Sequence, residues 1–110
     1  MQTENKMEES TLEISPTRFR SISAGSKAYT IRRGHRTFAK SIRITFTGTE
    51  RVESGIVNSF VHTVLSEVPF TVFESEGFLS FKEALDILRI FYPELDFTSK
   101  VTIVEFRLVS

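Results

Sequence analysis

The segment from Ala24 to Arg36 holds a dense group of residue types that could do chemistry. Lys27 follows Gly25 by two positions, and Thr30 follows Lys27 by three. A run of cations with one imidazole comes next: Arg32, Arg33, His35 and Arg36. A segment that only packed a core would not need so many polar groups beside two glycines. Such a cluster of cations raises the local concentration of anionic partners, such as nucleotides or RNA.

Charge is segregated along the chain although the net charge is zero. Residues 14–52 contain nine Lys or Arg and one acid, Glu50, whereas residues 53–99 contain eight acids and two cations. The basic block is centred on the segment described above, which favours an anionic partner. The alternative interpretation is that these cations only pair with the acids of the second half.

Composition limits the class of protein. A length of 110 residues indicates one domain. The chain has no cysteine, which excludes disulfides and thiolate metal sites and fits a reducing compartment. Its two histidines are separated in sequence, so no metal site is expected. Residues 1–11 are polar and are expected to form a disordered leader, and no apolar run approaches the ~20 residues of a membrane span, so we expect a cytoplasmic protein without membrane contact.

The hydrophobic pattern is mostly that of β-strands. Strands are expected at 12–14, 28–33, 41–47 and 100–108, with a short extended piece at 70–73. A long strand is expected at 56–68 that is apolar on both faces, with Ile56, Phe60 and Val64 on one face and Val57, Val61 and Leu65 on the other. Residues 48–55 are expected to form a turn. Helices are predicted from Pro16 to Ala24 and from the capping box at Ser80 to the residue before Pro93. Residues 12–110 are therefore predicted to form one α+β domain, mostly β: a small barrel of about five to six strands with two flanking helices.

A resemblance to a known family rests on the motif Gly25-x-Lys27-x-x-Thr30-x-Arg32. It resembles the G-x-K-x-x-T-x-R motif of ASCH domains, a branch of the small β-barrels that include the PUA RNA-binding modules. The closer similarity is to the small bacterial N4-acetylcytidine amidohydrolases of that branch, and it extends to the helix that ends at Tyr92-Pro93 and to the strand with Val104-Glu105-Phe106. The chain departs from the pattern at Lys40-Ser41, where ASCH domains usually carry a Gly-Asp pair. The resemblance implies a PUA-like barrel; no cofactor and no metal are expected.

The resemblance also implies catalytic roles for Lys27, Thr30 and Glu76. Thr30 would attack the acetyl carbonyl while neutral Lys27 accepts its proton. Glu76 would handle the leaving amine of cytosine and later the water that releases acetate. The base role requires a buried lysine, because burial disfavours the charged form. Since alternate side chains of a strand point to opposite faces, Lys27 is expected to come from the loop before the strand of Thr30.

Four residues are expected to bind the substrate: Arg32, Arg33, Tyr29 and Glu74, the last being also the other candidate for the catalytic carboxylate. The preferred hypothesis is an amidohydrolase that acts on N4-acetylcytidine or a related N-acylated pyrimidine nucleoside. Two alternatives stay open. One is a non-catalytic RNA-binding module that uses the same cleft, and the other is an ASCH ribonuclease that acts on single-stranded RNA.

Overall fold

Five strands and two α-helices make up the part of the chain that the computed structural model describes, residues 8–14 and 27–109. Their order is β1 (Glu9–Ile14), β2 (Ala28–Arg33), β3 (Phe38–Phe46), β4 (Val52–Val64), α1 (Phe70–Ser75), α2 (Phe81–Phe91) and β5 (Lys100–Leu108). A short 3-10 turn, η2 (Leu65–Glu67), joins β4 to α1. The predicted α+β, mostly β fold is confirmed.

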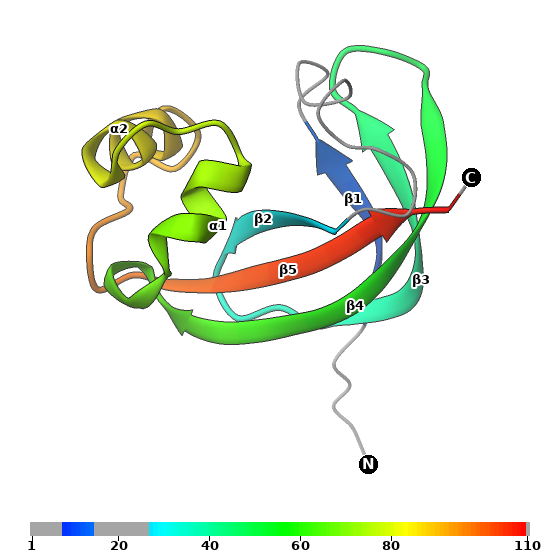
Figure 1. The fold of residues 1–110 in the computed structure, drawn as a ribbon, viewed down its shortest axis with the longest axis horizontal. Helices are drawn as coiled ribbons and strands as arrows, with labels where there is room; N and C mark the ends of the chain where they lie inside the picture. The colour runs from blue at the N-terminus through cyan, green and yellow to red at the C-terminus, as the bar shows by residue number, and fades with distance from the viewer. Residues whose placement is uncertain (1–7, 15–26, 110) are drawn as a thin grey trace.

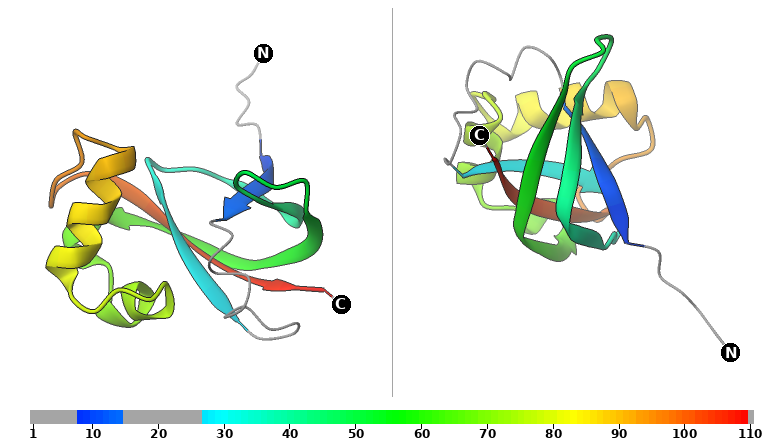
Figure 2. Two further views of the ribbon diagram at one scale, coloured as in Figure 1. Left: turned by 90° about the horizontal axis from the view of Figure 1, so that it is seen from above. Right: turned by 90° about the vertical axis from the view of Figure 1, so that its right-hand side faces the viewer.

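The five strands form one sheet in the order β1-β3-β4-β5-β2. β1 pairs with β3 in parallel, and the other three pairs are antiparallel. The sheet curls into a half-barrel, with α1 and α2 at one end of it (Figures 1 and 2). Its two edge strands approach each other closely enough for the Arg32 side chain of β2 to reach the backbone carbonyl of Glu13 in β1.

Period-two alternation located three strands well. β2 and β5 have the predicted bounds, and in β3 the side chains of Ile42, Ile44 and Phe46 are buried as expected. β3 begins earlier, at Phe38, and β1 begins at Glu9, inside the segment predicted to be a leader. The two extensions belong together, because Glu9 pairs with Phe38 in the parallel ladder. Residues 1–7 lie outside the described residues.

The long strand β4 starts at Val52, within the predicted turn, and ends at Val64 rather than at Val68. Its register against β5 shifts between Val57 and Ser59, which is a β-bulge. The extra residue reverses the side-chain phase, so Phe60 packs against the same core as Val57 while Val61 is exposed. The prediction that Val57, Val61 and Leu65 share one face was therefore wrong.

The helices differ from the prediction in one case. α2 is capped by Ser80, whose Oγ accepts a hydrogen bond from the N–H of Glu83, and it ends before Pro93 as expected. Residues 70–73, predicted as extended, belong instead to α1. Pro69 suits the start of a helix, and burial of Val72 and Phe73 selects the helical conformation. The helix predicted from Pro16 to Ala24 lies outside the described residues.

Two hydrophobic cores result from this arrangement. The sheet core lies inside the curl, and its described members all come from the strands β1 to β5. The lobe core lies between the helices and the outer faces of β2 and β5, and it includes Ile31, Leu65, Phe73, Leu85 and Val101. β2 and β5 thus contribute side chains to both cores. Neither described helix has the length and apolar character that a membrane crossing requires.

Candidate functional site

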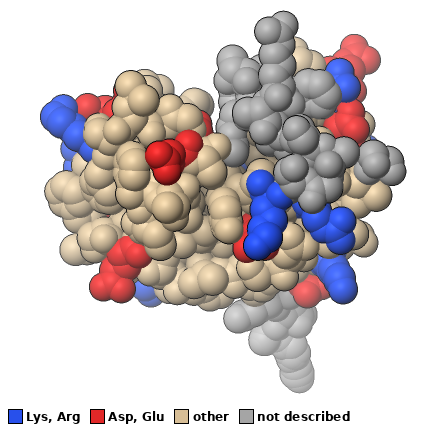
Figure 3. All heavy atoms as spheres, in the orientation of Figure 1, with Lys and Arg blue, Asp and Glu red and all other residues tan. Residues whose placement is uncertain are grey.

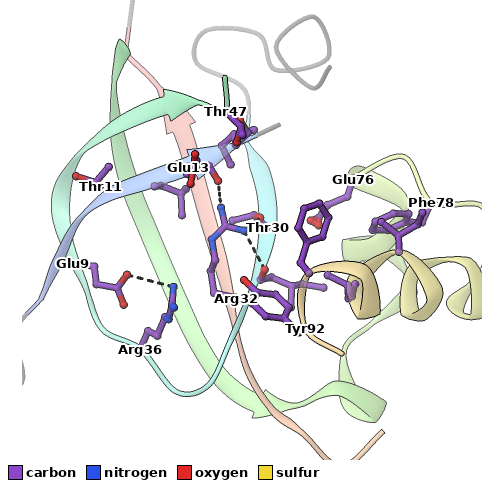
Figure 4. A pocket seen from close by; sticks show the side chains of 16 residues that line it. Glu9, Thr11, Glu13, Thr30, Arg32, Arg36, Thr47, Glu76, Phe78 and Tyr92 are labelled. Atoms are coloured by element: carbon purple, nitrogen blue, oxygen red, sulfur yellow. Dashed lines mark hydrogen bonds and ion pairs between the residues drawn. The ribbon is translucent and has the colours of Figure 1, made fainter. Parts of the chain in front are cut away.

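A pocket of about 940 Å³ lies where the two edges of the sheet face α2 (Figure 4). β1 and β2 form its polar wall, α2 forms the opposite wall, and the segment after α1 closes one side. The described residues that line it are Glu9, Thr11, Leu12, Glu13, Ile14, Thr30, Ile31, Arg32, Arg36, Thr47, Glu76, Phe78, Ile87, Leu88, Phe91 and Tyr92. Residues far apart in the sequence therefore share one cavity.

The Arg32 guanidinium bridges the seam between the two edge strands. Its Nη1 donates to Thr30 Oγ1 at 2.9 Å and to the Ile31 carbonyl at 3.2 Å. Its Nη2 donates to the Glu13 carbonyl of β1. The planar fork of Arg suits this arrangement, because it presents several N–H donors in fixed directions. One side chain thus joins β1, β2 and the Thr30 hydroxyl.

Thr30 lies at the floor of the pocket, with 2% of its surface exposed. It occupies the middle of β2, where it is paired with Val104 of β5. This pairing fixes its backbone, and Arg32 fixes its hydroxyl oxygen. Because the guanidinium only donates, the hydroxyl hydrogen of Thr30 must point toward another acceptor.

Glu76 enters the pocket from the end of α1 (Figure 4). The helix ends there in a Schellman motif. Its two hydrogen bonds run from the N–H of Gly77 to Glu74 O at 2.9 Å and from the N–H of Phe78 to Phe73 O at 3.1 Å. Gly77 has φ +93°, the left-handed conformation that this ending needs. The same turn places Phe78 against Phe73, with ring centroids 6.4 Å apart. The end of α1 thus delivers both Glu76 and Phe78 to the cavity.

The opposite wall is apolar and aromatic. Ile87, Leu88, Phe91 and Tyr92 come from consecutive turns of α2 and the residue that ends it. Phe91 is 71% exposed, so this wall is open to a ligand. A flat ring could stack on such a surface while polar groups of the ring reach the strands. Sequence reasoning missed this wall, because it assigned no site role to these residues.

The charged residues that line the described part of the pocket are mixed in sign: Glu9, Glu13, Glu76, Arg32 and Arg36. Arg36 also pairs with Glu9, at 3.5 Å between Nη1 and Oε1. Lys and Arg side chains gather over the strands on the face shown in Figure 3, whereas the helical lobe carries separate acidic and basic groups there. The described lining thus holds three acids and two cations, so it has no net positive charge that would attract a polyanion.

Three of the seven predicted site residues line the pocket: Thr30, Arg32 and Glu76. Lys27 stands immediately before β2, as expected from the strand geometry, but it is exposed and does not line the cavity. It has no hydrogen-bond or ion-pair partner within residues 8–14 and 27–109. Its role as a base remains a prediction.

The other predicted contacts also lie outside the pocket. Tyr29 packs against the lobe core on the other face of β2, Arg33 is exposed at the end of that strand, and Glu74 is exposed on α1. Of the two candidate carboxylates, the cavity therefore contains Glu76. In the described segments, no group of three or more His, Asp or Glu side chains could hold a metal ion.

His35 and His62, to which no site role was assigned, stack on each other. Their ring centroids are 4.6 Å apart and their planes differ by 4°. Each Nε2 lies within hydrogen-bond distance of a backbone carbonyl, that of Thr63 for His35 and that of Arg36 for His62. The contacts hold the loop between β2 and β3 against β4, which is a structural role.

The chain was compared with protein-family models, with curated proteins and with solved structures, and none of them matches it.

Proposed function

We propose that the protein is an amidohydrolase of the ASCH type that removes the acetyl group from N4-acetylcytidine or a related N-acylated pyrimidine nucleoside. The observation that carries this proposal is the shared pocket of Thr30 and Glu76. A hydroxyl and a carboxylate in one cavity are the groups that acyl transfer needs for attack and for proton transfer. The proposed reaction is a cytoplasmic one, in keeping with a chain that lacks cysteine.

The two walls of the pocket match the two parts of such a substrate. The aromatic side chains of Phe78, Phe91 and Tyr92 suit the flat pyrimidine ring. Glu76 suits the exocyclic amide, because a carboxylate accepts a hydrogen bond from its N–H and, once protonated, can return a proton to that nitrogen. The described lining has no net positive charge, which favours a nucleoside over a long RNA strand.

In the proposed reaction the Thr30 oxygen bonds to the acetyl carbon as its hydroxyl proton passes to Glu76, and the bond from that carbon to N4 of cytosine breaks. Protonated Glu76 gives its proton to the leaving nitrogen. A water molecule then attacks the acetyl-threonine ester while Glu76 takes a proton from that water and passes it to the Thr30 oxygen. The products are cytidine and acetate, and Thr30 is regenerated.

The first experiment incubates the purified chain with N4-acetylcytidine and measures cytidine release by chromatography. Thr30→Val keeps the side-chain volume but removes the hydroxyl, and Glu76→Gln removes the carboxylate; each is expected to reduce kcat by about a thousandfold or more. Thr102→Val is the matched control for Thr30, because Thr102 is also a buried threonine, in β5, and its Oγ donates to Gly34 O at 2.6 Å. Glu67→Gln is the control for Glu76, because Glu67 is exposed and does not line the pocket.

Turnover by the wild type that is lost only in the two pocket variants would support the proposal. No cytidine release by the wild type, or full activity in Thr30→Val, would reject it. Salt-sensitive RNA binding without turnover would instead favour the RNA-binding module, and cleavage of a short single-stranded RNA would favour the ribonuclease.

A further inference from the structure

The contacts of Arg32 suggest a role that a substrate-binding residue would not have. Its guanidinium already holds three protein oxygens, namely Thr30 Oγ1, the Ile31 carbonyl and the Glu13 carbonyl. Two of them are backbone groups on different strands. The third is the oxygen that the proposed reaction uses as its nucleophile. The cation is thus positioned by the fold and directed at a reacting atom.

A positive donor at 2.9 Å from a hydroxyl oxygen changes the chemistry of that oxygen. Ionisation of the hydroxyl places negative charge on Oγ1, and a hydrogen bond from a cation to the charged form favours it. The small exposed fraction of Thr30 strengthens this effect, because little water competes for the oxygen. The guanidinium stays protonated, so it cannot itself accept the proton.

We infer that Arg32 is a catalytic residue that activates Thr30, with the backbone carbonyl of Glu13 in β1 holding the guanidinium in place. This inference rests on the proposed hydrolase function. In the activating step the Thr30 hydroxyl proton passes to the Glu76 carboxylate, and the Oγ1 electron pair forms the bond to the acyl carbon. Glu76 then gives that proton to the leaving nitrogen as the C–N bond breaks, so charge and protons balance.

This assignment replaces the activation by Lys27 that the motif implied. A base at position 27 would have to reach Oγ1 from the residue before β2, whereas Lys27 is exposed and outside the pocket lining. Arg32 is two residues from Thr30 on the same strand and contacts Oγ1 directly. Activation by Arg32 predicts a larger loss of kcat in Arg32→Ala than in Lys27→Ala, whereas activation by Lys27 predicts the reverse.

The experiment measures steady-state kinetics on N4-acetylcytidine for Arg32→Ala, Arg32→Lys and Lys27→Ala, with Arg43→Ala as the matched control. Arg43 is an exposed arginine of β3 that does not line the pocket. Arg32→Ala is expected to lower kcat by about 10²- to 10³-fold, as loss of one charge-stabilising donor does, with KM changed less than about threefold. Arg32→Lys keeps the charge but loses the planar fork of donors. Its kcat is therefore expected to lie between that of the wild type and that of Arg32→Ala.

A second measurement separates catalysis from folding, because Arg32 also joins β1 to β2. Added guanidinium chloride at millimolar concentration is expected to restore part of the kcat of Arg32→Ala, which a purely structural defect would not allow. Thermal unfolding of each variant is recorded beside it. If Arg32→Ala does not fold, Arg32→Lys decides: full kcat in that variant, together with a larger loss in Lys27→Ala, overturns the inference.

Other outcomes are equally decisive. An active wild type whose kcat survives in Arg32→Ala, or falls equally in Arg43→Ala, rejects the role of Arg32 while the proposed function stands. A rise in KM alone would make Arg32 a substrate contact and also reject the inference. No turnover by the wild type rejects both proposals.

Discussion

The sheet core and the lobe core are built by different means. In the sheet core, a strand such as β3 buries one face. Ile44 and Phe46 are therefore buried, whereas the residues between and beside them are more exposed. The lobe core is assembled from short segments, η2, α1 and α2, that bury residues such as Leu65 and Phe73 against β2 and β5. The first is determined by strand periodicity and the second by packing between short elements.

The difference explains where the pocket lies. β2 carries Ala28 in the sheet core and Ile31 in the lobe core, so its two faces belong to different structures. The pocket opens along this strand, where the curled sheet meets the helices. Strand edges supply hydrogen-bonding groups there, and α2 supplies apolar surface. The junction of the two cores thus combines hydrogen-bonding groups with an apolar surface on which a flat ligand ring could stack.

The largest expected effect on stability comes from creating a cavity in either core. Phe46→Ala in the sheet core and Phe73→Ala in the lobe core should each lower the free energy of unfolding by about 3–5 kcal/mol, because both side chains are nearly or fully buried. Urea unfolding followed by circular dichroism measures this. If the cores form one cooperative unit, both variants keep a single transition and an unchanged m value. Two transitions in Phe73→Ala alone would show that the lobe unfolds separately.

A smaller effect is expected from overfilling the sheet core at Gly55 in β4. A Cβ at this position would lie 2.5 Å from Ile44 Cδ1 and 3.2 Å from the Arg107 carbonyl oxygen. Because Ile44 is fully buried and would have to shift within a packed core, Gly55→Ala should cost about 1–3 kcal/mol of unfolding free energy. Ile44→Val in the same chain should recover part of this loss. Wild-type stability in Gly55→Ala would mean that the sheet core is loosely packed.

The same contrast shows what could be predicted from the sequence. β3 and β5 were found because a buried residue at every second position leaves a clear pattern, and α2 was found because Ser80 and Pro93 mark its ends. The bulge after Val57 left no such signal, since it depends on the register with β5. Residues 70–73 were misassigned because four apolar or β-branched residues suit either conformation, and contacts with the rest of the lobe decide.

The candidate site was predictable only in part. The resemblance pointed to Thr30, Arg32 and Glu76, which share the pocket, and also to Lys27, which does not line it. The aromatic wall and the bond from Arg32 to the Glu13 carbonyl could not be foreseen, because they depend on how the sheet edges and α2 meet in space. A spacing motif carries information about one strand but little about what faces it.

At the junction of the cores, Phe91→Ala should weaken substrate binding without affecting stability. If the ring of a pyrimidine stacks on Phe91, its loss should raise the Kd for N4-acetylcytidine about tenfold, as measured by calorimetry with Thr30→Val as the inactive background. Ile90→Ala is the matched control, because Ile90 is equally exposed, at 71%, on the same helix but does not line the pocket. Equal effects of the two substitutions would remove α2 from the binding surface.

Within the lobe, the N-cap of α2 should contribute about 1 kcal/mol to the free energy of unfolding. Ser80 Oγ accepts from the Glu83 N–H at 3.1 Å, and the Glu83 carboxylate accepts from the Leu79 N–H at 3.0 Å. Ser80→Ala should lower the unfolding free energy by that amount, while Ser80→Asp, which can also cap, should not. Chemical denaturation of the three proteins under identical conditions gives the comparison. An unchanged stability in Ser80→Ala would show that packing alone holds α2 in the lobe.

The smallest expected effect is a pH dependence in the turn that leads from the lobe to β5. The Thr98 hydroxyl and N–H both donate to Asp96 Oδ1 at 2.8 Å, and these bonds, with a weaker contribution from Ser99, hold the pKa of Asp96 below its usual value. A carboxylate whose pKa is lower in the folded state stabilises the fold above its unfolded pKa, and this contribution is lost as the pH falls through the folded value.

Asp96→Asn keeps the acceptor oxygen but removes the charge. The difference in unfolding free energy between the wild type and Asp96→Asn should therefore be largest at neutral pH and shrink below about pH 4. Glu94→Gln, two residues away on the surface, makes no hydrogen bond within the described residues and serves as the control. A difference that stays the same across this pH range would mean that the turn is held by the hydrogen bonds alone and not by the charge of Asp96.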